Sequence, residues 1–159
     1  TSGSVWGRLG NWSFYHDCGI EGEKMSIASY FFISNLDEAK NSEELPNVPE
    51  GNLKTFYGVM NTSVECLYPI LKVGEDIDLN DIAQSEDYTS CTFSFPQEYI
   101  DTLCSTDTSK ESVLIENWMK IEDCPYDNKQ DLSDLLNALI DLAKIANSTD
   151  QALYFRMEM

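Results

Sequence analysis

The chain has 159 residues, 42% of them hydrophobic, and its 28 Asp and Glu side chains against 10 Lys and Arg give a formal net charge of −18. This length fits one domain, and the apolar content suffices for a packed core, so a disordered chain is not expected. The charge argues against direct contact with nucleic acid, whose phosphates require cations, and against an anionic membrane surface.

The first part of the chain is rich in segments with strand character, because β-branched and aromatic residues run in short stretches bounded by glycine, proline and polar residues. We expect strands, the first as a glycine-containing hairpin, over residues 5–15, 25–33, 53–60 and 88–95. The acidic segment 41–52, with two prolines, predicts a loop. Residues 62–72 stay open, because a capping-box pattern favours a helix that Pro69 would interrupt.

Helical patterns dominate the second part. Capping residues followed by apolar stripes predict three helices, beginning at Ser94, Thr108 and either Asp127 or Asn128. The third is the longest and runs to Asn147, and the alternation over 153–158 predicts a closing strand. Strands early, helices late and a final strand indicate an α+β fold: a single acidic domain over residues 1–159, with an antiparallel or mixed sheet packed by C-terminal helices.

Few side chains suit catalysis or metal binding. The five cysteines form no C-x-x-C pair and are expected as reduced, mostly buried thiols. The single histidine, His16, excludes multi-histidine metal sites, and beside Cys18 it is more readily a surface residue than a catalytic base. No glycine-rich nucleotide motif and no G-x-S-x-G pattern occurs. We therefore predict a non-enzymatic protein with no catalytic residues, no metal and no cofactor.

The apolar segments and the cysteines also predict the cellular compartment. No apolar stretch approaches the length of a bilayer span, and no secretory signal is visible. Reduced cysteines are typical of the cytosol. The expected localisation is cytoplasmic.

The most distinctive feature is the segment between Lys72 and Lys110, which holds nine acids and neither Lys nor Arg. Half of the net charge lies there, and repulsion between carboxylates opposes folding. A second acidic group surrounds Trp118 and Tyr126. Complementary charge accelerates association with a cationic protein, and aromatic side chains anchor it. We therefore predict a surface for a basic partner that consists of Glu75, Asp76, Asp78, Asp81, Glu86, Asp87, Tyr88, Glu122, Asp123, Tyr126 and Asp127.

Other interpretations of the acids stay open, beginning with a plain solvated surface. The pattern Asp76-x-Asp78-x-Asn80 matches the start of an EF-hand loop, but Asp81 and Asp87 replace the glycine and glutamate that this loop requires. A carboxylate-based hydrolase would hold two acids with different pKa values in one pocket. A DNA mimic would need long acidic helix faces, which the longest predicted helix shows only modestly.

In size, charge and order of elements, the chain resembles the small acidic immunity proteins of bacterial toxin systems. The resemblance rests on general character and on no residue motif. It implies a cytosolic inhibitor that blocks a cognate toxin, frequently a cationic nuclease, by steric occlusion and charge matching. The expected partner is thus a basic protein such as a toxin domain, with no nucleic-acid or membrane partner.

Overall fold

A computed structural model describes residues 27–41 and 43–159 of the chain. In this part, five strands form one antiparallel sheet in the order β2-β1-β5-β4-β3. The strands are β1 (Ala28–Ser34), β2 (Leu53–Tyr57), β3 (Asn80–Gln84), β4 (Ser90–Ser94) and β5 (Ala152–Glu158). The C-terminal strand β5 therefore lies at the centre of the sheet. The predicted hairpin over 5–15, His16 and Cys18 lie outside the described residues.

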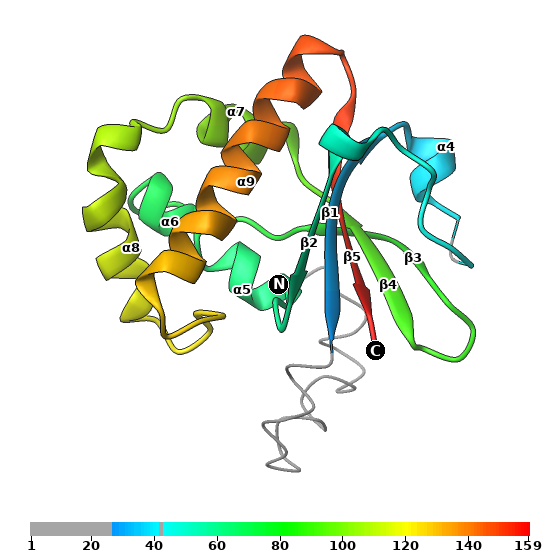
Figure 1. Cartoon of the computed structure of the whole chain (residues 1–159), viewed down its shortest axis with the longest axis horizontal. Helices are drawn as coiled ribbons and strands as arrows, with labels where there is room; N and C mark the ends of the chain where they lie inside the picture. Colours follow the sequence, from blue (N-terminus) through cyan, green and yellow to red (C-terminus); the bar gives the residue numbers. More distant parts are fainter. Residues whose placement is uncertain (1–26, 42) are drawn as a thin grey trace.

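Most helices cover one face of this sheet, and the short helix α4 lies on the other (Figure 1). The helices are α4 (Leu36–Ala39), α5 (Asn61–Glu65), α6 (Tyr68–Leu71), α7 (Gln97–Cys104), α8 (Glu111–Met119) and α9 (Lys129–Ser148). Two 3-10 turns, η1 (Glu50–Asn52) and η2 (Thr108–Lys110), precede β2 and α8. This arrangement confirms the predicted α+β class. None of the described helices is long and apolar enough to cross a lipid bilayer.

The central strands β1, β5 and β4 are mostly buried on both faces, which explains their apolar runs, whereas the edge strands β2 and β3 are half-buried or exposed. On the helical side, Phe155 of β5 stacks on Phe31 of β1, with ring centroids 4.6 Å apart, and on Phe93 of β4 at 6.0 Å. On the opposite side, Phe32 stacks on Tyr154 at 5.6 Å. Cross-strand aromatic pairs of this kind hold the register of the three central strands.

Helix α9 packs along the helical side through the predicted apolar stripe, all of which is buried: Leu132, Leu135, Leu136, Leu139, Ile140 and Ala143. Of the two candidate caps, Asn128 is the one used, because its side chain accepts hydrogen bonds from the backbone N–H groups of Gln130 and Asp131. The predicted closing strand is confirmed as β5.

Several boundaries differ from the sequence prediction. Strand β2 ends at Tyr57 instead of residue 60, because Gly58 adopts a positive φ of 76° and turns the chain away. The ambiguous segment 62–72 forms two short helices, α5 and α6, with Pro69 in the first turn of α6, where its missing N–H costs nothing.

The acidic segment contains a strand, β3, that sequence analysis does not predict. Strand β3 pairs antiparallel with β4 at the edge of the sheet, with a register irregularity between Asp81 and Ala83. Helix α7 begins at Gln97, and Ser94 does not cap it, because Phe95 still donates its N–H to the carbonyl of Leu153 in β5.

Candidate functional site

The structure distributes the predicted partner-binding residues over separate surface segments. Glu75, Asp76 and Asp78 lie between α6 and β3, Asp81 lies on β3, and Glu86, Asp87 and Tyr88 form the β3–β4 turn. The remaining residues lie in the connection between α8 and α9: Glu122, Asp123, Tyr126 and Asp127. Figure 1 shows the β3–β4 turn at the far right and the α8–α9 connection at the lower left. These two groups therefore do not form one continuous patch.

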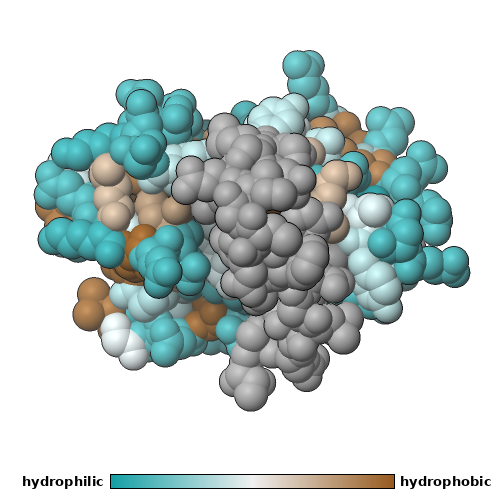
Figure 2. Space-filling model, turned by 90° about the horizontal axis from the view of Figure 1, so that it is seen from below, coloured by the Kyte–Doolittle hydropathy of each residue, from teal (hydrophilic) through white to brown (hydrophobic). Residues whose placement is uncertain are grey.

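The carboxylates of this surface have few cationic neighbours. The described residues carry 25 of the 28 Asp and Glu side chains but 8 of the 10 Lys and Arg. Within this part, ion pairs join Lys72 to Glu75, Lys129 to Glu116 and Arg156 to Glu158. Arg156 is 3% exposed and also donates to Ser90 and to the carbonyl of Asn41, so its charge acts inside the fold. On either side of the grey residues in Figure 2, hydrophilic side chains are interspersed with smaller apolar patches.

The β3–β4 turn is organised by Asp87. Its carboxylate accepts hydrogen bonds from the hydroxyl of Ser85 at 2.8 Å and from the hydroxyl and backbone N–H of Thr89 at 2.7 and 3.2 Å. The bonds from Thr89 and then Ser85 lower the pKa of Asp87, because they stabilise the ionised form. Tyr88, at the tip, is 42% exposed. This turn thus presents a fixed negative charge beside an accessible ring.

The aromatic residues of the second acidic group are less accessible than their setting in the sequence suggests. Trp118 is fully buried in the core, so it cannot contact a partner. Tyr126 is half-buried and donates its hydroxyl to the carbonyl of Tyr57 at 2.7 Å. Burial raises the pKa of Tyr126 to about 12. Tyr126 thereby ties the α8–α9 connection to the end of β2.

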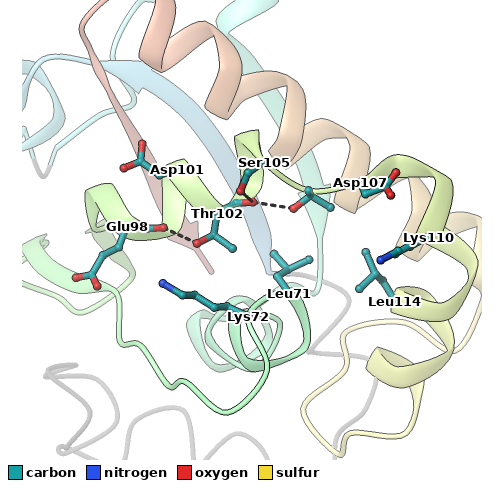
Figure 3. Close-up of a pocket in the computed structure, with 10 residues that line it drawn as sticks. Leu71, Lys72, Glu98, Asp101, Thr102, Ser105, Asp107, Lys110 and Leu114 are labelled. Carbon is teal, nitrogen blue, oxygen red and sulfur yellow. Dashed lines mark hydrogen bonds between the residues drawn. The ribbon is translucent and has the colours of Figure 1, made fainter.

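A groove of about 530 Å³ opens among α6, α7, η2 and α8, within the size range of ligand sites. Its lining residues are Leu71, Lys72, Glu98, Asp101, Thr102, Ser105, Thr106, Asp107, Lys110 and Leu114. Figure 3 shows Lys72, Glu98 and Asp101 toward one end, and Asp107 and Lys110 toward the other. Leu71 lies between the two lysines. The groove is therefore amphipathic, with charged ends and an apolar middle.

Several polar groups of the groove are held in place by their neighbours. Asp101 accepts hydrogen bonds at one oxygen, Oδ1, from the side-chain amides of Gln97 at 2.9 Å and Asn147 at 3.3 Å. Asp107 accepts from the N–H and hydroxyl of Ser109, which lowers the pKa of Asp107. The helical hydroxyls donate to their own helix, for example Thr102 to the carbonyl of Glu98 at 2.7 Å. Their lone pairs remain available to a ligand.

A carboxyl group with a raised pKa lies outside the groove. Glu65, at the end of α5, has its pKa raised to about 7, chiefly by burial, and it does not line the groove. Among residues 27–41 and 43–159, no group of three or more His, Cys, Asp or Glu side chains is placed to hold a metal ion. Cys66 and Cys104 are free thiols, and burial raises the pKa of Cys66 to about 11.

The groove was not predicted as a unit, although the sequence contains parts of it. Glu98, Asp101 and Asp107 belong to the nine acids between Lys72 and Lys110 but not to the predicted partner surface. The available signal was the spacing of Glu98 and Asp101, which places them on one helix face. No protein-family model, curated protein or solved structure matches the chain.

Proposed function

We propose that this chain is an acidic binding module that recognises a basic partner protein. The observation that carries the proposal is the scarcity of cations among the exposed carboxylates. Residues 73–109 contain nine acids and neither Lys nor Arg, and the described chain shows an ion pair from Glu75 of this segment to Lys72. Like charges held together without compensation oppose folding, and a cationic partner would relieve this repulsion.

The resemblance to the immunity proteins of bacterial toxin systems suggests a more specific partner. The partner would be a toxin domain such as a nuclease, and this chain would block it in the cytoplasm without turning over a substrate. Inhibition would come from covering the cationic cleft that normally receives a phosphate backbone.

The decisive experiment is affinity purification from the native host, followed by calorimetry with the purified partner. We expect a protein of high pI that binds in the nanomolar range, with an affinity that falls as salt rises. An affinity that does not change with ionic strength, or a partner of acidic pI, would refute the proposal. Steady turnover of a substrate by the purified chain, lost on a single Asp→Asn change, would favour the hydrolase instead.

A variant pair tests the predicted surface itself. Asp76→Lys with Glu86→Lys changes two exposed acids, and Glu43→Lys with Glu44→Lys gives the same charge change in the segment that follows α4. We expect the first pair to weaken partner binding by at least about tenfold more than the second. Equal losses would show that net charge, and not this surface, sets the affinity.

A further inference from the structure

We propose that the groove among α6, α7, η2 and α8 is the docking site for an arginine-bearing segment of the basic partner, in which aliphatic residues flank the arginine. This inference rests on the proposed function and adds to it the place of contact and the chemistry of the recognised segment. The groove was outside the surface that the sequence predicts, so the two assignments are tested separately.

The first argument is the arrangement of acceptors. Glu98 and Asp101 are three residues apart on α7, on the same face of the helix, and both line the groove. Gln97 and Asn147 both donate to Oδ1 of Asp101, so the carboxylate is fixed, and among the described residues no donor occupies Oδ2. Figure 3 shows the Glu98 and Asp101 side chains extending in different directions, so each is a separate acceptor. A guanidinium group, with five donors in a planar fork, suits such a carboxylate better than a lysine ammonium does.

The second argument is the apolar surface beside these acceptors. Leu71 lies between the two lysines and Leu114 lies beside Lys110, and both line the groove, where they can receive the aliphatic stem of an arginine. The two segments that supply them also carry Val73 and Val113, which are 88% and 59% exposed. Binding hot spots combine a desolvated apolar contact with charged groups around it. The segment that fits therefore carries aliphatic side chains on either side of its arginine.

Third, the lining of the groove carries three carboxylates, Glu98, Asp101 and Asp107, against two ammonium groups, Lys72 and Lys110, so its charge is net negative. Lys72 forms an ion pair with Glu75 at 3.4 Å, which is the main cause of the raised pKa of Lys72, and the charge of Glu98 adds a smaller contribution. Lys72 thus occupies the position of a cation next to Glu98, and Figure 3 shows its side chain extending toward that residue. An incoming guanidinium has to compete with this internal ammonium. Removal of the Lys72 charge is therefore expected to tighten binding.

The test uses the full chain and three short synthetic peptides of equal length. One alternates arginine with leucine, one alternates arginine with serine, and one alternates glutamate with leucine. Dissociation constants are measured by calorimetry at low salt, and the contacted residues are mapped by amide chemical shifts. The groove variants are Glu98→Lys with Asp101→Lys, and Ser105→Trp, which fills the groove without a change of charge. The matched charge control is again Glu43→Lys with Glu44→Lys.

We expect the arginine–leucine peptide to bind the wild-type chain tightest and to shift amides of α7 and α8. Both groove variants should raise its dissociation constant by at least about tenfold, while the control pair changes it by less than about threefold. Lys72→Gln should lower the dissociation constant, and Lys40→Gln, a matched change next to α4 on the opposite face of the sheet, should do so less. Thermal unfolding of each variant checks that it is folded. If Glu98→Lys with Asp101→Lys does not fold, the Ser105→Trp variant alone tests the groove.

Two results overturn the inference while the proposed function stands. In one, groove and control variants lose the same affinity; in the other, arginine–serine binds as well as arginine–leucine. Failure of both arginine peptides to bind the wild-type chain in a salt-sensitive manner counts against the proposed function as well.

Discussion

Glu65 is the residue at which burial and charge conflict most directly. Its carboxylate accepts the backbone N–H of Leu79 at 2.8 Å and the side-chain amide of Asn61 at 3.4 Å, which joins α5 to the segment that leads into β3. Its pKa is raised from 4.5 to about 7, chiefly by burial and in smaller part by the charges of Asp78 and Asp81, while both hydrogen bonds oppose the shift. Near neutral pH this group therefore holds a proton that it would lose in the unfolded chain.

The raised pKa of Glu65 makes the free energy of unfolding fall as the pH rises. A folded-state pKa above the unfolded value stabilises the fold below pH 4.5, and this stabilisation is lost as the pH rises through about 7. The loss amounts to at most about 3 kcal/mol. Glu65→Gln keeps the acceptor for Leu79 and removes the ionisation, so we expect it to raise the melting temperature at pH 8 and leave it nearly unchanged at pH 5.

Calorimetric melting at both pH values checks this prediction. The exposed Glu44→Gln is the matched control and should change neither melting temperature. An equal effect of Glu65→Gln at pH 5 and pH 8 would show that the mutation acts through packing and not through the proton.

At the scale of elements, the start of α9 gives a sharp test of local structure. Asn128 accepts hydrogen bonds at 2.8 Å from the N–H of Gln130 and at 3.2 Å from that of Asp131. Asn128→Ala leaves these donors without their cap and should cost about 1 kcal/mol of unfolding free energy. Asp127→Ala, at the rival capping position in the sequence, should cost much less. Urea denaturation of both variants measures the difference, and equal losses would contradict the assignment of the cap.

The elements that the sequence predicts well are those whose stability comes from their own pattern. Helix α9 carries a continuous apolar stripe and a capping residue, and β5 carries the period-2 alternation of Leu153, Phe155 and Met157, so both were expected nearly to the residue. Strand β3 has the polar sequence NDIAQ, and its conformation depends on pairing with β4. Ser94 has the pattern of a cap, but the sheet holds Phe95 in extended pairing and moves the helix start to Gln97. Tertiary contacts decide both cases.

The candidate site was harder to predict for a related reason. The acid-rich segment was visible in the sequence, but the groove draws its lining from four elements, between Leu71 and Leu114. Which of the nine acids face it depends on how α7 packs against α6, α8 and α9. Composition therefore identified a charged segment. The fold shows that Glu98 and Asp101 line the groove, whereas the carboxylate of Asp87 accepts hydrogen bonds within its own turn.

At the scale of the whole molecule, the net charge of −18 sets how stability responds to ionic strength. The described surface holds many more carboxylates than cations, and the three ion pairs within residues 27–41 and 43–159 compensate few of them. Repulsion of this kind is screened over about 10 Å at 0.1 M salt, whereas buried contacts are affected far less. Added salt should therefore stabilise the fold.

We expect the melting temperature to rise by several degrees between about 0.01 and 0.15 M sodium chloride, and to level off once the screening length falls below the spacing of the surface charges. Choline chloride should act equally, because the effect depends on ionic strength and not on the identity of the cation. Asp76→Asn with Glu86→Gln, which removes two of the exposed charges, should raise the melting temperature at low salt and reduce the rise with added salt. A melting temperature that does not respond to salt would mean that the carboxylates are far enough apart to tolerate one another. In that case a cationic partner would gain no binding energy from the relief of repulsion between these carboxylates.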